Sequence, residues 1–81
     1  ESKAMALCER SFLRYLNGGC QSPIGAYAVI ENETLLLRAF ISSLDGQDVI
    51  EMEDSSAIED AEFLGKKLAK EMLNLGAKKF L

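Results

Sequence analysis

Residues 24–42 read IGAYAVIENETLLLRAFIS and contain two apolar segments separated by the polar residues 31–34. In each segment apolar side chains recur at every second position, which is the period of a β-strand half buried against a core. We expect one strand from Ile24 to Glu31 and a second from Leu35 to Ser42. Two strands joined by so short a break pair antiparallel, so this stretch predicts a hairpin. The residues that share one face are Ile24, Ala26, Ala28 and Ile30 in the first strand, and Leu35, Leu37, Ala39 and Ile41 in the second.

A third strand is expected beyond the hairpin. Residues 43–47 contain the pair Asp45-Gly46, which is typical of a tight turn. Residues 48–53 then alternate Ile50 and Met52 with more polar positions, again with the period of a strand. The sequence therefore predicts a three-stranded antiparallel meander.

Helical patterns flank the predicted sheet. From Ser2 to Leu16, apolar side chains recur at steps of three and four residues, and Asn17-Gly18 marks the end of that helix. The expected apolar stripe of this first helix comprises Met5, Cys8, Phe12, Tyr15 and Leu16.

A second amphipathic pattern extends to Gly76, and Ser56 with Glu59 has the spacing of a capping box at its start. Gly65 lies near the apolar stripe of this helix, where it would allow a close approach to the sheet. The stripe comprises Ala61, Leu64, Leu68, Met72 and Leu75.

The order helix, three strands, helix predicts an α+β fold. One apolar layer satisfies all five elements if both helices cover the same face of the antiparallel sheet. The sequence contains no repeat, linker or low-complexity stretch. We therefore expect a single domain over residues 1–81.

Composition limits the possible functions. The chain has 81 residues, a net charge of −4 and no histidine. The acidic balance argues against a nucleic-acid partner, and the lack of a metal-ligand cluster argues against zinc. No apolar run approaches the roughly 18 residues of a membrane span, and the first residues do not resemble a signal peptide. We expect a cytoplasmic, monomeric protein that binds no nucleic acid, membrane or metal.

The two cysteines differ in their surroundings. Cys8 lies on the apolar stripe of the first helix, which favours core packing. Cys20 follows Gly18 and Gly19 on a predicted loop, where a thiol is accessible for covalent attachment or nucleophilic chemistry. The alternative is that Cys20 only fills space between elements. Two cysteines form no disulfide framework, so we expect both thiols to be reduced.

Several short motifs follow one another at compatible separations and together resemble the C-terminal domain of the porphobilinogen deaminases, also called hydroxymethylbilane synthases. This resemblance spans nearly the whole chain. It implies that the chain is the third domain of such an enzyme and that the catalytic first and second domains lie outside it. The motifs are Glu9-Arg10-Ser11-Phe12-Leu13, residues 18–28 (GGCQSPIGAYA), Ser43-Leu44-Asp45-Gly46, Glu59-Asp60-Ala61 and Leu75-Gly76-Ala77.

The resemblance also implies a role for Cys20. In that family the matching cysteine forms a thioether to a dipyrromethane cofactor, which is itself made from two substrate units. The enzyme condenses four porphobilinogen molecules onto this cofactor, loses ammonia each time, and releases hydroxymethylbilane for haem biosynthesis. The family's catalytic carboxylate and substrate-binding arginines have no counterpart in this sequence. The implied partners are porphobilinogen, the growing oligopyrrole chain and the sister domains, and we expect the isolated chain to be inactive and without cofactor.

A thiol suits this attachment. Loss of ammonia from an aminomethylpyrrole gives a soft electrophile, for which a thiol or thiolate is a good nucleophile. The tether then keeps the growing chain at a high effective concentration. A thiol just beyond the C-terminus of a helix is not activated by the helix dipole, so basic groups in the other domains would have to activate it.

Two alternatives have no enzymatic chemistry. Double-stranded-RNA-binding domains share the order α-β-β-β-α, but their second helix starts with basic groups, whereas this one starts with Glu59, Asp60 and Glu62. The other alternative is a non-catalytic interaction module. The acidic residues of the predicted strands and turns are expected to be solubilising charges without a catalytic role: Asp45, Asp48, Glu51, Glu53 and Asp54.

Overall fold

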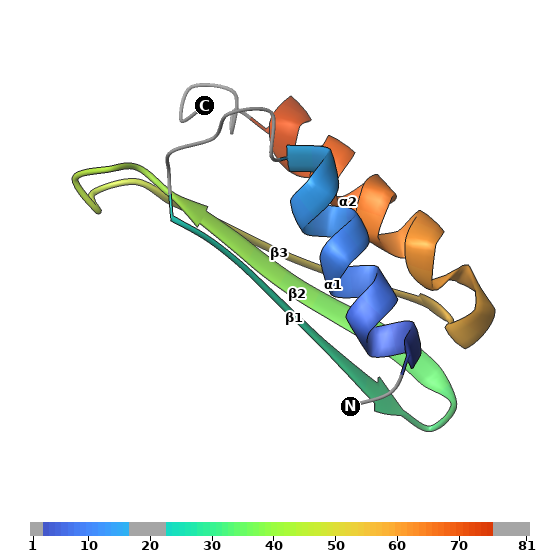
Figure 1. Ribbon diagram of the computed structural model, residues 1–81. Helices are drawn as coiled ribbons and strands as arrows, with labels where there is room; N and C mark the ends of the chain where they lie inside the picture. Colours follow the sequence, from blue (N-terminus) through green and yellow to red (C-terminus); the bar gives the residue numbers. More distant parts are fainter. Residues whose placement is uncertain (1–2, 17–22, 76–81) are drawn as a thin grey trace.

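The computed structural model describes residues 3–16 and 23–75, which form two helices and one antiparallel sheet (Figure 1). The predicted order of elements and the α+β class are confirmed. The elements are α1 (Lys3–Leu16), β1 (Ile24–Glu31), β2 (Thr34–Ser42), β3 (Val49–Ala57), the short 3₁₀ helix η1 (Ile58–Asp60) and α2 (Ala61–Asn74).

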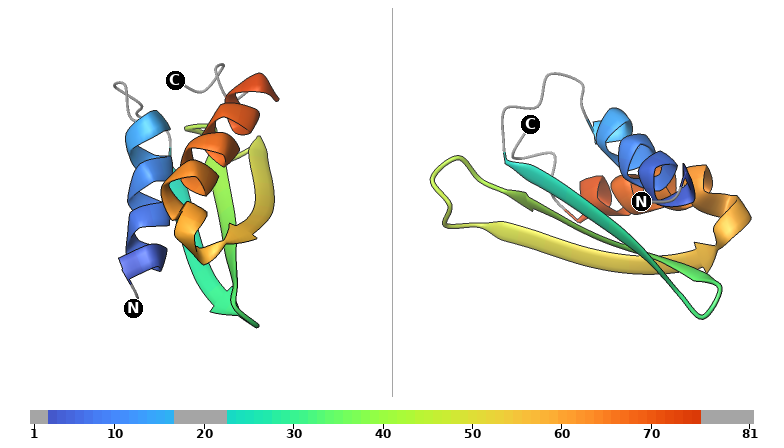
Figure 2. Two further views of the ribbon diagram at one scale, coloured as in Figure 1. Left: turned by 90° about the vertical axis from the view of Figure 1, so that its right-hand side faces the viewer. Right: turned by 60° about the horizontal axis from the view of Figure 1, so that its bottom comes forward.

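The molecule has two layers. The strands are ordered β1-β2-β3, and each neighbouring pair is antiparallel. Both helices lie on the same side of this sheet, as predicted (Figure 2). The opposite face of the sheet has no covering element among the described residues.

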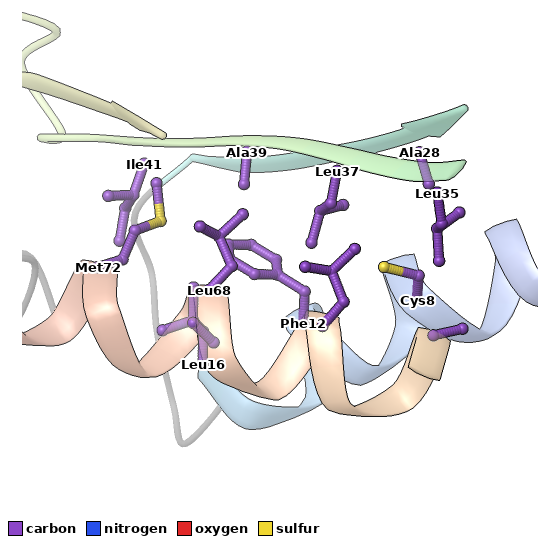
Figure 3. Close-up of a cluster of buried hydrophobic side chains, with 13 residues drawn as sticks. Cys8, Phe12, Leu16, Ala28, Leu35, Leu37, Ala39, Ile41, Leu68 and Met72 are labelled. Atoms are coloured by element: carbon purple, nitrogen blue, oxygen red, sulfur yellow. The ribbon is translucent and has the colours of Figure 1, made fainter. Parts of the chain in front are cut away.

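The core lies between the layers, where side chains of the strands point toward those of the helices (Figure 3). The residues that the period-two pattern places together on one face of β2 are all buried. Tyr15 and Leu75 were wrongly expected on the apolar stripes, because their side chains are 46% and 63% exposed. The buried apolar residues are Cys8, Phe12, Leu16, Ala28, Leu35, Leu37, Ala39, Ile41, Ala61, Leu64, Leu68, Ala69 and Met72.

The start of the second helix differs from the prediction. β3 continues to Ala57, which pairs with Thr34 of β2, so the backbone of Ser56 belongs to the sheet. The Ser56 hydroxyl donates to the carbonyl of Ala57 and caps no helix. The expected capping box with Glu59 is therefore wrong, and η1 provides the turn that leads into α2.

Gly65 sets the distance between the two helices. A Cβ atom at this position would lie 2.5 Å from the carbonyl oxygen of Cys8 and 2.8 Å from the nitrogen of Phe12, both backbone atoms of α1. The close approach expected for Gly65 therefore exists, but it is made to α1 and not to the sheet. Beside it, the buried hydroxyl of Ser11 donates to the carbonyl oxygen of Glu62 at 2.8 Å.

An ion pair joins β3 to α2. The Lys67 ammonium lies 3.0 Å from a carboxylate oxygen of Asp54. Partial burial acts to raise the pKa of Asp54, but the bonds from Lys67 and from the Ser55 N–H outweigh it, so the pKa lies below the ordinary 3.8. Asp54 is thus a half-buried strand residue, and its prediction as a solvated charge is wrong.

Gly65→Ala should destabilise the fold. The added methyl meets backbone atoms that cannot rotate away, so we expect a loss of about 2 kcal/mol in the free energy of unfolding, despite the better helix propensity of alanine. Urea denaturation measures this loss.

Gly46→Ala is the matched control. Gly46 has φ of +76°, but a methyl group added to it would meet nothing within 4 Å, so only backbone strain of about 1 kcal/mol is expected. A Gly65→Ala variant as stable as the parent would contradict the proposed close approach.

Asp54→Asn should change the pH dependence of stability. Because the pKa of Asp54 is lowered in the folded state, its ion pair stabilises the fold above the unfolded pKa and is lost as the pH falls through the folded pKa. The difference in unfolding free energy between parent and variant should therefore be present at pH 6 and shrink below about pH 4. A difference that stays constant over this range would contradict the assignment.

Candidate functional site

The predicted anchor, Cys20, and its neighbours Gly18 and Gly19 lie outside the described residues. The structure does describe the residues on either side of that segment. Leu16 ends α1 with its side chain only 1% exposed in the core. Pro23 precedes β1, and its carbonyl oxygen accepts a hydrogen bond from the Ser42 N–H at 2.9 Å. Both flanking positions are thus held by the fold.

The turn between β2 and β3 lies at the end of the sheet where β1 begins, because Ser42 at the end of β2 donates a hydrogen bond to Pro23, which precedes β1. The Ser43 hydroxyl donates to a carboxylate oxygen of Asp45, which also accepts the Gln47 N–H at 3.0 Å. These two bonds hold the pKa of Asp45 below its ordinary value. The motif Ser43-Leu44-Asp45-Gly46 is therefore a hydrogen-bonded turn.

Glu9 connects α1 to the edge of the sheet. Its carboxylate accepts the N–H of Ala28 at 2.8 Å. β1 is an edge strand, whose outward N–H groups find no partner within the sheet. In the sequence, Glu9 stands out only as the first residue of the motif 9–13, because its contact with the sheet depends on the position of β1. Glu9 thus holds β1, the strand that follows the Cys20 segment.

Cys8 is an unreactive thiol. Its side chain is fully buried, and burial together with the nearby charge of Glu9 raises the pKa of Cys8 to about 11. A thiol that stays protonated and inaccessible is a poor nucleophile. The prediction that Cys8 packs in the core is confirmed.

The acidic residues do not converge on one site. Glu53 pairs with Arg38 at 2.8 Å on the uncovered face of the sheet, whereas Asp54 pairs with Lys67 on the other face. Within residues 3–16 and 23–75, no three acidic or thiol groups lie close enough to hold a metal ion. No helix in this part of the chain is long and apolar enough to span a membrane.

The chain matches a known protein family over most of its length. The family model described as porphobilinogen deaminase, C-terminal domain, matches residues 3–74. The chain belongs to this family. The predicted resemblance is therefore confirmed, and the match includes the segment that carries Cys20.

Three relatives, each called porphobilinogen deaminase, give the same result. The chain is 43% identical over 81 residues to the protein of Desulforamulus reducens, 48% over 73 residues to that of Carboxydothermus hydrogenoformans, and 44% over 80 residues to that of Prochlorococcus marinus. These matches cover 100%, 90% and 99% of this chain but 26%, 24% and 25% of the relatives. The chain thus spans about a quarter of the length of these porphobilinogen deaminases.

The first family-like motif, residues 9–13, now has a structural explanation. Glu9 binds β1, Ser11 binds α2, and Phe12 fills the core. These three side chains leave α1 in different directions and fix it to the rest of the domain. The motif therefore holds α1 in place. Leu16, the last residue of α1, precedes the segment that carries Cys20.

Glu9→Ala should loosen the edge of β1. Loss of a hydrogen bond to a charged acceptor should cost about 1.5 kcal/mol and increase the hydrogen exchange rate of the Ala28 amide. Exchange followed by NMR measures both effects. Glu51→Ala, which removes an exposed carboxylate of β3, should leave Ala28 unchanged. Equal Ala28 exchange in parent and Glu9→Ala would contradict this role.

Proposed function

We propose that this chain is the cofactor-anchoring domain of a porphobilinogen deaminase and that Cys20 carries dipyrromethane through a thioether. The observation that carries the proposal is the family match over residues 3–74, which includes Cys20. The sequence has two cysteines, and the other one, Cys8, is fully buried with a raised pKa. Cys8 is therefore unsuited to attachment, which supports Cys20 as the anchor.

The frame around Cys20 fits a covalent anchor. Leu16 is buried in the core and Pro23 is hydrogen-bonded to Ser42, so the fold holds the described residues on either side of the segment that carries Cys20. Attachment forms a bond between Sγ of Cys20 and the methylene carbon of an aminomethylpyrrole. The carbon–nitrogen bond breaks, the thiol gives up its proton, and ammonia leaves. When bound, the cofactor supplies the primer to which further pyrroles are added.

The complete protein would be a transferase that polymerises four porphobilinogen units into hydroxymethylbilane. Its acid–base groups and its binding sites for pyrrole carboxylates would lie in the remaining three quarters of the polypeptide. The described carboxylates of this chain are dispersed, and Glu53 and Asp54 are already paired with Arg38 and Lys67. The chain alone would therefore turn over no substrate and carry no cofactor, and it would hold the primer only as part of the complete protein. We further propose that the complete enzyme is cytoplasmic and monomeric.

The two alternatives predict no thioether. An RNA-binding domain would need a cationic start of α2, but Glu59, Asp60 and Glu62 are exposed there and would repel phosphate. A non-catalytic interaction module would use the same fold and leave Cys20 unmodified. The chemical state of Cys20 therefore distinguishes the proposal from both.

Intact-mass measurement of the full-length protein tests the proposal. The parent protein should carry a mass increment of two pyrrole units, and Cys20→Ser should lack this increment and be inactive. Cys8→Ala is the matched control, because it removes the other thiol and should keep both the increment and the activity after allowance for reduced stability.

An active parent protein without the increment would contradict the anchor. So would an increment that persists in Cys20→Ser but disappears in Cys8→Ala.

A further inference from the structure

The face of the sheet opposite the helices carries large apolar side chains. Tyr27 of β1, Phe40 of β2 and Val49 of β3 are 65%, 42% and 52% exposed on this face. Val29 and Leu36 lie on the same face as a directly paired, half-buried couple. A face that only meets water does not need five such residues, and extended apolar patches mark interaction surfaces. We call these five residues the sheet patch.

The surface of this patch is uneven. Three adjoining hollows of roughly 360 to 430 Å³ lie along it, and Arg38 lines all three. The ring of Phe40 lies directly over Gly25 on the neighbouring strand, where any side chain would collide with it. Ridges and hollows of this size fit the side chains of a protein partner.

The charges within the patch are compatible with being covered. Arg38 and Glu53 already pair with each other at 2.8 Å, so a partner would leave neither charge unmatched. Glu51 borders two of the hollows and has no ion-pair partner within residues 3–16 and 23–75. A complementary partner surface is therefore apolar and presents a lysine or arginine opposite Glu51.

We propose that the sheet patch docks against the preceding domains of the same polypeptide. This rests on the proposed function, in which the chain is the C-terminal quarter of a longer enzyme. The matched relatives leave about three quarters of their length outside this domain, and that part is permanently tethered to it. Both helices already occupy the other face of the sheet. The sheet patch is thus an apolar surface that no element among the described residues covers, and it is free for an interface between domains.

Hydroxyl-radical labelling of the full-length protein tests this docking. Tyr27 of the sheet patch and Phe63 of α2 are each 65% exposed in this structure and have similar aromatic side chains, so they form a matched pair. If the patch is docked, Tyr27 should be labelled about fivefold more slowly than Phe63, because residues at the centre of an interface lose contact with water. Comparable labelling of both would overturn the proposal. Slower labelling of Phe63 would do the same and would place the interface on the helices.

Two variants test which surface forms the interface, and dilution tests whether the interface forms within one polypeptide. Tyr27→Glu should increase the labelling of Phe40 several-fold by opening the interface, and Phe63→Glu should leave Phe40 unchanged. Protection of Tyr27 that disappears on dilution would indicate a second copy of the protein and would overturn docking within one polypeptide.

The two-pyrrole increment can be measured on the same sample. If the increment is present but Tyr27 is not protected, the result would support Cys20 as the anchor and overturn the docking of the sheet patch. Protection without the increment would support the docking and overturn the anchor.

Discussion

The contact between α1 and α2 at Gly65 is the constraint on which the rest of this structure depends. A side chain at this position would collide with the backbone of Cys8 and Phe12. Because the helices come this close, both fit on one face of a sheet of three strands and bury a shared core there. The other face is left open. The same contact holds α1 against α2, and the segment that carries Cys20 follows α1 in the sequence.

Polar bonds complete the placement of α1. Ser11 binds the carbonyl of Glu62 beside the Gly65 contact, and Glu9 binds the edge of β1 on the other side. The first bond gives a buried hydroxyl its partner, and the second satisfies an N–H that the sheet leaves unpaired at its edge. Residues that look like a functional motif in the sequence thus act by positioning. The proposed chemistry depends on a different residue, Cys20.

Much of this architecture could be predicted from the sequence, because burial imposes different periods on helices and strands. The alternation placed Leu35, Leu37, Ala39 and Ile41 on one face of β2, and all four are buried in the structure. Other features depend on contacts distant in the sequence. The extension of β3 through Ser56 follows from its pairing with β2, and the partner of Gly65 follows from how the helices dock. Cys20 is proposed from its motif alone, because the described residues include only the positions on either side of its segment.

The central claim is that one of two thiols carries the cofactor, and tryptic peptide mapping of the complete protein, purified with its modification intact, tests it most directly. Trypsin separates the thiols, because cleavage after Lys3, Arg10, Arg14 and Arg38 places Cys8 in residues 4–10 and Cys20 in residues 15–38. The account predicts the two-pyrrole increment on the peptide 15–38, with fragment ions that locate it at Cys20. An increment on the peptide 4–10, or unmodified forms of both peptides from active enzyme, would contradict it.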